Sequence, residues 1–306
     1  TIVQTAKENL AEKGYAVIED VLTDEQIKTA KEYFNEWLQS SPHIQTAHLK
    51  TDPHGIFKYS EVGHQRHAWY IRTLEAVQAP FRAIWETDDI VTSFDGSCWM
   101  PANNKMSKDG VWTHTDQAPD TKGRECVQGF VSLTSNKERT LQVYEGSHLL
   151  HEKYMTDNGI TGKKNWQPII PEYLSLIEDK KRILKVKAGS LVLWDSRTFH
   201  QNRNILSKHI NQVDGGGDVV AEHIGEERIV QYVCFLPKNN KANTENMKKK
   251  RMKYYEERRT TSHWPYPIHV NGKQPQTYGD STLLINYDEL QKPNLDDLDE
   301  KIRAIL

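Results

Sequence analysis

The sequence predicts a mainly β protein with helical support, an α+β fold in which short strands form a sandwich or a barrel. From about residue 90 to 240 the chain consists of short segments rich in Val, Ile, Phe, Tyr and Trp, bounded by Gly, Pro, Asn or Asp. Few helical patterns interrupt this stretch, which argues against a parallel α/β sheet. We expect one domain over residues 1–306, with helical support in 1–89, the β core in 90–240 and a C-terminal extension with helices in 241–306.

The first forty residues predict a helix, a strand and a second helix. AKENLAEKG is helix-forming and stops at Gly14, and YAVIED predicts a short strand. The segment LTDEQIKTAKEYFNEWLQSS places Thr23 and Gln26 at the spacing of a capping box. One apolar helical face follows, made of Ile27, Ala30, Phe34 and Trp37. A further helix, interrupted by Pro80, is expected in TLEAVQAPFRAIWET.

Five segments are expected to supply the strands: DIVTSFDGSCWMP, VQGFVSLT, TLQVYEGSH, ILKVKAGSLVLWDSRTFHQN and RIVQYVCFLP. Residues 205–227 contain three consecutive glycines and predict a lid, a binding loop or a disordered stretch. Residues 241–260 are dense in charge and predict a solvated helix face, with phosphate binding as the minor alternative. Near the C-terminus, Asn294 is expected to cap an amphipathic helix.

Composition narrows the class of protein. The chain has 40 Lys and Arg against 42 Asp and Glu, a formal net charge of −2, which argues against nucleic acid or an anionic membrane as the main partner. The three cysteines form no CxxC pair, so neither a zinc ribbon nor a disulfide framework is indicated. No apolar run approaches a membrane span. We therefore expect a reduced, cytoplasmic location; because the chain begins at Thr1, a removed leader stays open.

The segment WTHTDQAP holds His114 and Asp116 two positions apart. In a strand, such residues point to the same side, and an imidazole with a carboxylate suits Fe(II), Mn(II) or Zn(II). A polar turn is the alternative. His200 ends the strand GSLVLWDSRTFH and is either a buried, hydrogen-bonded histidine or a third ligand. Together the three residues predict a facial triad, which leaves open positions on iron.

An arginine could serve the same site as a clamp for a carboxylate. Arg228 begins the apolar strand RIVQYVCFLP, and guanidinium geometry suits bidentate contact with a carboxylate. The alternatives are a surface position for Arg228, or the same role for Arg203, which follows His200 by three residues.

These motifs, in this order, resemble the phytanoyl-CoA dioxygenase-like branch of the Fe(II)/2-oxoglutarate-dependent oxygenases over about residues 10–240. The strand TDDIVTSFDGSCWMP also resembles the one that precedes H-x-D in that branch. The resemblance implies a double-stranded β-helix (jelly-roll, cupin-like) core, with His114, Asp116 and His200 as iron ligands. It also implies that Arg228 binds the distal carboxylate of 2-oxoglutarate and that Asn202 makes a small polar contact to it. The Arg follows the distal His by 28 positions here (228 − 200), instead of about a dozen, because the glycine-rich segment intervenes.

The family implies that O2 and 2-oxoglutarate are co-substrates and that an unactivated C–H bond of a small molecule is oxidised. The outcome would be hydroxylation, desaturation or oxidative cyclisation, the last as in the kainoid synthases, which act on an amino-acid-derived metabolite. The carboxylate of Asp116 argues against halogenation, because halogenases of this superfamily carry a small residue there. Candidates for the substrate pocket are Trp69, Arg72, Asn104, Trp112 and Gln117, the last also a candidate contact for 2-oxoglutarate.

An inward Arg66 or Arg72 would indicate a carboxylate-bearing substrate. Two other functions stay open: a jelly-roll module that binds a metal such as zinc without redox chemistry, and an oxygenase whose substrate is a protein. The oligomeric state is left open as well.

Overall fold

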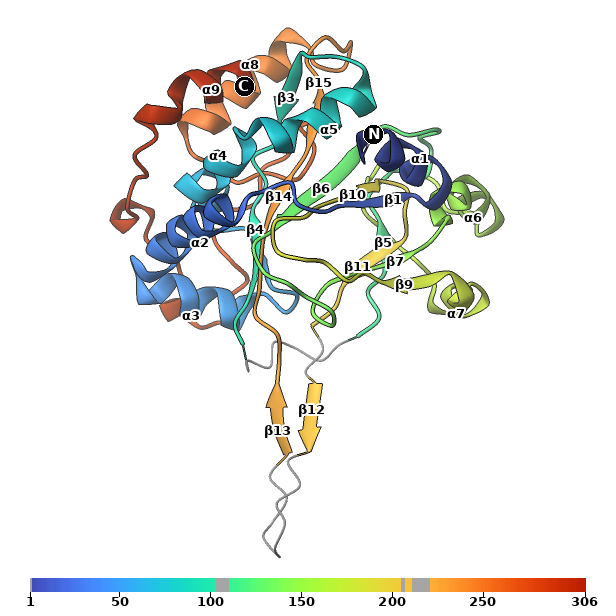
Figure 1. Cartoon of the computed structure of the whole chain (residues 1–306), viewed down its shortest axis with the longest axis horizontal. Coiled ribbons are helices and arrows are strands. Elements are labelled where there is room, and N and C mark those ends of the chain that lie inside the picture. Colours follow the sequence, from blue (N-terminus) through green and yellow to red (C-terminus); the bar gives the residue numbers. More distant parts are fainter. Residues whose placement is uncertain (1, 103–109, 205–206, 211–220) are drawn as a thin grey trace, which may run out of the picture.

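The computed structural model describes residues 2–102, 110–204, 207–210 and 221–306, with the backbone alone at 207–210 and 221–224. Two antiparallel sheets lie face to face at the centre of the molecule (Figure 1). The larger has the strand order β1 (Tyr15–Ile18), β10 (Leu191–Asp195), β6 (Val127–Ser132), β14 (Arg228–Val233), β4 (Ser97–Met100) and β2 (Ile56–Phe57). The smaller has the order β8 (Gln167–Pro168), β5 (His114–Thr115), β11 (His200–Asn202), β7 (Leu141–Tyr144) and β9 (Lys181–Ile183). This is the predicted α+β fold with a jelly-roll core.

Strand alternation divides the larger sheet into two faces. On β6, Val127 and Val131 pack with the helices, whereas Phe130 packs with Leu141 and Val143 of the smaller sheet. The same period of two on β14 turns Ile229 and Val233 toward the helices and Val230 toward the space between the sheets. Residues 228 and 232 share the parity of Val230, so β14 presents Arg228 and Tyr232 to the interior between the sheets.

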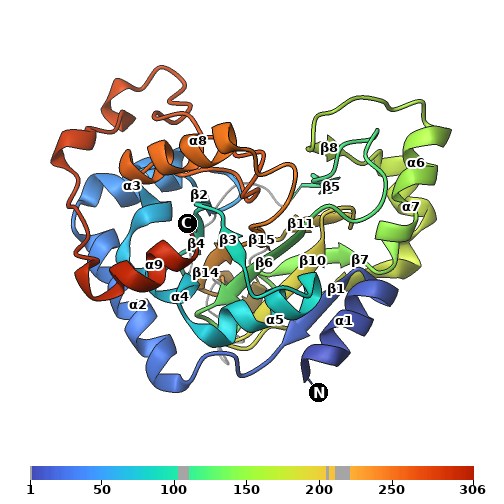
Figure 2. The same ribbon diagram turned by 90° about the horizontal axis from the view of Figure 1, so that it is seen from above.

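Helices cover the outer face of the larger sheet and flank the smaller one (Figure 2). The helices are α1 (Ile2–Lys13), α2 (Asp24–Gln39), α3 (Pro42–Thr51), α4 (Arg66–Arg72), α5 (Glu75–Trp85), α6 (His151–Asp157), α7 (Pro171–Leu176), α8 (Glu245–Glu256) and α9 (Asp299–Ala304). The strand pair β15 (Phe235–Pro237) and β3 (Ile90–Thr92) packs beside α5. Among the described residues, no helix has the length and apolarity to cross a membrane.

Several local predictions are confirmed. Helix α1 ends at Gly14, whose φ of +82° is one that glycine adopts without strain. The capping box of α2 is formed: the Gln26 amide donates to Thr23 Oγ1 at 3.2 Å, and the Thr23 amide donates to Gln26 Oε1 at 3.0 Å. The charged segment after residue 241 contains α8, with Thr244 as its N-cap.

Other predictions are wrong in part. Helix α5 continues through Pro80, so this proline does not interrupt it. Strand β1 lies in the predicted strand segment YAVIED; it joins the larger sheet, as does β2, so residues 1–89 contribute two strands as well as helices. In the stretch 205–227, for which a lid, a binding loop or a disordered stretch is expected, β12 (Ser207–Ile210) and β13 (Ala221–Ile224) form an antiparallel pair; a role as a lid or binding loop stays a prediction. This pair extends away from the two sheets (Figure 1). Asn294 Oδ1 does accept from the Asp296 amide at 3.0 Å, but the turn that begins there, Asp296–Leu298, is 3-10, and α9 starts only after it. The predicted pocket residue Asn104 lies outside the described residues.

Candidate metal centre

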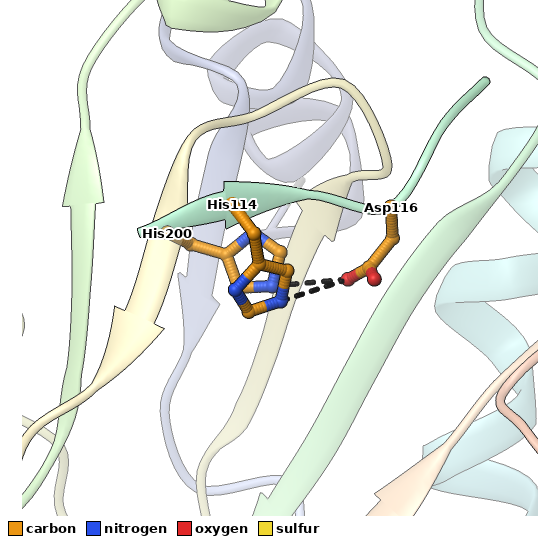
Figure 3. Close-up of side chains that lie close together, drawn as sticks. All are labelled: His114, Asp116 and His200. Atoms are coloured by element: carbon orange, nitrogen blue, oxygen red, sulfur yellow. Dashed lines mark ion pairs between the residues drawn. The ribbon is translucent and has the colours of Figure 1, made fainter. Parts of the chain in front are cut away.

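Two neighbouring strands of the smaller sheet bring the predicted triad together. His200 on β11 stands directly opposite His114 on β5, and Asp116 follows two residues after His114 (Figure 3). The inner face of the sheet therefore carries all three side chains, as the spacing predicted. Their ligand atoms all lie within 4.8 Å of one another.

The carboxylate of Asp116 lies between the two imidazoles. Its Oδ2 is 3.5 Å from His114 Nε2 and 3.2 Å from His200 Nε2. All three residues are buried, each less than 10 % exposed. A ring of two imidazole nitrogens and one carboxylate oxygen on one side of a small space is the ligand set of a facial triad.

The backbone fixes the orientation of both imidazoles. Nδ1 of His114 lies 3.1 Å from the carbonyl oxygen of Trp112, and Nδ1 of His200 lies 2.8 Å from that of Thr198. A carbonyl can only accept, so each Nδ1 carries the proton and each Nε2 of a neutral ring keeps its lone pair. Both lone pairs are directed to the position where a metal would bind.

The electrostatics of the cluster suit a divalent cation. Burial alone would raise the pKa of Asp116, but His114 and His200 hold it well below its usual range. Burial lowers the pKa of His200, and His114 lowers it further. Burial opposes protonation of His114 as well, but Asp116 outweighs it and raises its pKa. The buried carboxylate is thus an anion that needs compensation, which a metal ion supplies.

Gln128 of β6 holds Asp116 from the larger sheet. Its Nε2 donates to Asp116 Oδ2 at 2.9 Å, and the Asp116 amide donates to the carbonyl of Ser196 at 2.9 Å. No motif marks Gln128 in the sequence; its only signal is that of a polar residue inside the apolar strand VQGFVS. Such support orients a ligand carboxylate and adds to metal affinity.

Arg228 is buried in the core, and no carboxylate is paired with its guanidinium among the described residues. It is 1 % exposed, and its Nη1 and Nη2 have no hydrogen-bond partner among the described residues. Its guanidinium carbon lies 5.3 Å from the centroid of the Phe130 ring. A buried, unpaired guanidinium is costly, so this position is suited to an anionic ligand with two oxygens. Nearby, Asn202 Nδ2 donates to the hydroxyl of Tyr232 at 3.0 Å.

Gln117 does not contribute to an open pocket, contrary to the prediction. It has no exposed surface, and its Nε2 donates to the carbonyls of Thr121 and Gly123 at 3.2 and 2.6 Å. Its Oε1 accepts from Ser196 Oγ at 2.9 Å and from the amide of Glu125 at 3.3 Å. Because the side-chain amide is fully used in shaping the loop after Asp116, none of it is left for a substrate or for 2-oxoglutarate.

The aromatic wall of the centre contains one expected and one unexpected tryptophan. Trp112 stacks on His114 with ring centroids 5.0 Å apart, and its Nε1 donates to the carbonyl of Asn202 at 3.0 Å. Trp166, which precedes β8, stacks on His114 at 5.6 Å and is 43 % exposed. No spacing in the sequence marks Trp166, because it reaches His114 only through the pairing of β8 with β5.

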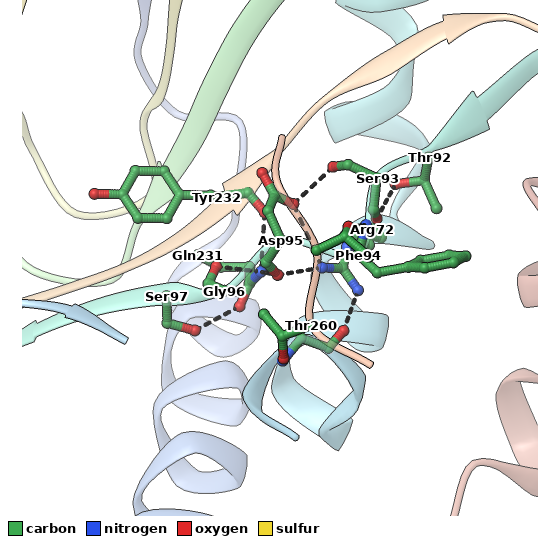
Figure 4. A network of polar contacts seen from close by, with 12 residues as sticks. Arg72, Thr92, Ser93, Phe94, Asp95, Gly96, Ser97, Gln231, Tyr232 and Thr260 are labelled. Atoms are coloured by element: carbon green, nitrogen blue, oxygen red, sulfur yellow. Dashed lines mark hydrogen bonds and ion pairs between the residues drawn. The ribbon is translucent and has the colours of Figure 1, made fainter. Parts of the chain in front are cut away.

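Trp69 and Arg72 are in the core, which corrects their prediction as pocket residues. Both have 0 % exposure. Arg72 Nη1 donates to the carbonyl of Gly63 at 2.6 Å, and Nη2 donates to that of Asp95 at 2.7 Å, within the polar network of Figure 4. Arg66 instead forms a bidentate ion pair with Asp297 at 2.8 Å. Neither arginine therefore supports a carboxylate-bearing substrate.

His263 in the C-terminal extension lies near the triad and was not predicted. It interacts electrostatically with Asp116, His200 and His114, and burial lowers its pKa to about 4. Its Nε2 is buried without a hydrogen-bond partner among the described residues. The segment TSHWPYP gives no signal for this position, because the contact joins residues 147 positions apart (263 − 116).

Comparison with known proteins agrees with this geometry. The family model "Phytanoyl-CoA dioxygenase (PhyH)" matches residues 10–212, more than half of the chain. "Ava biosynthesis cluster protein O" of Aspergillus versicolor is 29% identical over 229 residues, 70% of this chain and 69% of that protein.

Two solved structures share the fold. "GlcNAc Inducible Gene 2, GIG2 (DUF1479)" from Candida albicans has a TM-score of 0.58 at 16% identity, over 99% of this chain and 76% of that one. The epimerase SnoN, solved with Fe3+, alpha ketoglutarate and nogalamycin RO, has a TM-score of 0.50 at 15% identity, over 77% and 83%. With His114, Asp116 and His200 as the iron-binding triad, the chain belongs to the phytanoyl-CoA dioxygenase family of Fe(II)- and 2-oxoglutarate-dependent oxygenases.

Proposed function

We propose that this protein oxidises an unactivated C–H bond of a small metabolite in a biosynthetic pathway, by hydroxylation, desaturation or oxidative cyclisation. The observation that carries the proposal is the combination of a buried His–Asp–His cluster with a buried, unpaired arginine in one interior. A metal site without redox chemistry has no use for such an arginine. The biosynthetic context is supported by the similarity to Ava biosynthesis cluster protein O.

In this proposal each residue has a defined task. Nε2 of His114, Nε2 of His200 and Oδ2 of Asp116 hold Fe(II), and Gln128 keeps the carboxylate in place. Arg228 pairs with the distal carboxylate of 2-oxoglutarate. Asn202 and Tyr232, which are hydrogen-bonded to each other, offer polar contacts from the same interior.

The iron and 2-oxoglutarate together supply O2 activation, with release of succinate and CO2. The chain contributes binding, orientation and exclusion of water. Trp112 covers one part of the metal centre and Trp166 another, so that a substrate would lie against aromatic surface. An amino-acid-derived metabolite that cyclises, as with the kainoid synthases, is one substrate of this class.

One experiment tests the proposal. Fe(II) and 2-oxoglutarate are added without oxygen, and the weak visible charge-transfer band of the chelate is recorded. O2 is then admitted, and succinate is measured with a panel of amino acids, N-substituted amino acids, indole-derived metabolites and acyl thioesters. We expect the charge-transfer band from the protein with Fe(II) and 2-oxoglutarate when no metabolite is present. After O2 is admitted, we expect a subset of the small metabolites to increase succinate formation above the level without metabolite. A protein that binds Fe(II) but gives no band with 2-oxoglutarate would contradict the proposal.

A further inference from the structure

We propose that the C-terminal extension completes the substrate pocket, with His263 as a positioning residue that hydrogen-bonds through Nε2 to a hydroxyl, carboxyl or amide group of the substrate. This inference rests on the proposed oxygenase function. His263 lies outside residues 10–212, the part of the chain that the family model matches, so the inference adds a substrate contact to those of the proposed function.

The segment that carries His263 is attached firmly to the jelly-roll core. The amide of Thr261 donates to the carbonyl of Phe94 at 2.9 Å, and the amide of Phe94 donates back to Thr261 Oγ1 at 3.2 Å. A second connection joins the amide of Gly63 to Thr260 Oγ1 at 3.1 Å. Residues 260–271 fold back on themselves through a bridge between Thr261 and Val270. His263 is therefore held in place by backbone contacts on both sides.

The polar network around Arg72 supports the same attachment. Arg72 donates to the carbonyls of Gly63 and Asp95; Figure 4 labels Arg72, Asp95 and Thr260 in this network. Gly63 is also the residue that binds Thr260, and Asp95 follows Phe94, which binds Thr261. From the other side, the buried Arg251 of α8 donates to the carbonyls of Pro265 and Thr92 at 2.9 and 2.7 Å. Arg72 and Arg251 thus help to fix the segment that carries His263.

The hydrogen-bonding state of His263 fits a ligand contact. Its ring packs beside Trp264 with centroids 5.7 Å apart, while Nε2 is buried and has no partner among the described residues. A polar atom in this state costs free energy unless a partner arrives, and such groups discriminate strongly between ligands that can and cannot pair with them. An imidazole nitrogen without a partner can pair with hydroxyl, carboxyl or amide groups but not with hydrocarbon, so it favours a substrate that carries such a group.

Four proteins test this role: wild type, His263→Ala, His263→Gln and the control His269→Ala. His269 lies in the same 260–271 segment, but it is exposed. All four are expected to unfold at similar denaturant concentrations, and to give the anaerobic Fe(II)–2-oxoglutarate band with affinities within about twofold. A wild type without the band would contradict the proposed function itself and not only the role of His263.

The first measurement needs no substrate. Nitric oxide is added to the anaerobic Fe(II)–2-oxoglutarate protein, and the electron paramagnetic resonance line shape reports polar groups next to the open metal position. We expect His263→Ala to change the line shape and His269→Ala to leave it as in wild type. An unchanged spectrum in His263→Ala would overturn the placement of this residue.

The second measurement uses the panel compound that stimulates succinate formation most in wild type. We expect His263→Ala to need about tenfold more of it to perturb the charge-transfer band, the loss typical of one hydrogen bond, and His263→Gln to recover most of this affinity. Equal affinity in wild type and His263→Ala would overturn the proposal. So would a loss confined to 2-oxoglutarate binding, which would make His263 a co-substrate contact.

Discussion

His200 and His114 stand directly opposite each other on antiparallel strands, with ring centroids 4.4 Å apart, although 86 positions separate them in the chain (200 − 114). Each ring is turned by a backbone carbonyl two residues earlier, so that both Nε2 atoms face Asp116 Oδ2. Strand pairing thus brings the three ligand side chains together as part of the fold, so metal affinity should depend on the intact sheet.

Removal of one ligand should abolish tight metal binding without unfolding the protein. We expect His200→Ala to weaken Co(II) or Fe(II) binding by at least about a hundredfold in a calorimetric titration, because the triad falls to two ligands. The control His43→Ala removes a half-buried imidazole that contacts the Thr282 carbonyl and is not part of the triad, so this variant should bind the metal as wild type does. Tight binding that survives in His114→Ala/Asp116→Ala would contradict the ligand assignment.

Gln128 should matter to the metal although it does not touch it. We expect Gln128→Leu to lower Fe(II) affinity by about 10- to 100-fold, because Asp116 loses the donor that orients its carboxylate. Gln142→Leu is a matched control: Gln142 is buried on β7, but its neighbours Leu141 and Val143 face the interior, so it points away from the metal centre. Equal losses of affinity in the two variants would indicate a general packing effect.

Residues whose role depends on strand parity or on an ordered set of motifs could be predicted from the sequence. His114 and Asp116 share a face because strands alternate, and Arg228 faces the interior because it lies two positions before Val230. Gln117 and Arg72 could not be assigned in this way. Both are polar residues near the expected site, but local backbone carbonyls use their donors, and only the fold shows which carbonyls lie within reach.

Contacts between distant segments were missed for the same physical reason. Trp166 reaches His114 through an edge strand of two residues, and His263 approaches Asp116 through a segment anchored at Phe94. Neither segment has a periodic pattern that would predict its partner. The strand pair β12–β13 lies between β11 and β14 in the chain, and it accounts for part of the long gap between His200 and Arg228.

Arg228 should be required for 2-oxoglutarate binding but not for folding. We expect Arg228→Met to lower the affinity for 2-oxoglutarate by about a hundredfold, since a pair of charge-assisted hydrogen bonds contributes about 3 kcal/mol to binding. Without 2-oxoglutarate, its free energy of unfolding should be equal to or higher than that of wild type, because a buried unpaired charge is replaced by an apolar chain of similar length. The anaerobic charge-transfer band and urea unfolding measure the two effects.

Arg203→Met is the control for this prediction. Arg203 is half-buried in the turn after β11, where its backbone amide donates to the carbonyl of Thr140. We expect its 2-oxoglutarate affinity to match that of wild type. If Arg203→Met lost 2-oxoglutarate affinity and Arg228→Met did not, Arg203 would be the residue that binds the distal carboxylate.

Acid should destabilise the protein through buried histidines of the helical layer. Burial is the main cause and the positive charge of Arg72 the second cause that together lower the pKa of both His64 and His67 to about 3. An unfolded chain binds these protons near pH 6.5, so between pH 6.5 and 3 the unfolded state holds more protons than the folded state. The free energy of unfolding should therefore fall as the pH is lowered through this window, by about 1.4 kcal/mol per pH unit for each histidine.

His67→Gln isolates one of the two contributions. Glutamine can keep a hydrogen bond to Ser97 Oγ, which lies 3.1 Å from His67 Nε2, but it does not titrate. Urea unfolding at pH 6, 5 and 4 gives the slope of the free energy of unfolding against pH. In His67→Gln this slope should be smaller by the contribution of about one proton, about 1.4 kcal/mol per pH unit. In His269→Gln, which alters an exposed histidine, the dependence should stay as in wild type. If His67→Gln keeps the full slope, His67 is protonated in the folded state, and other groups must then cause the loss of stability in acid.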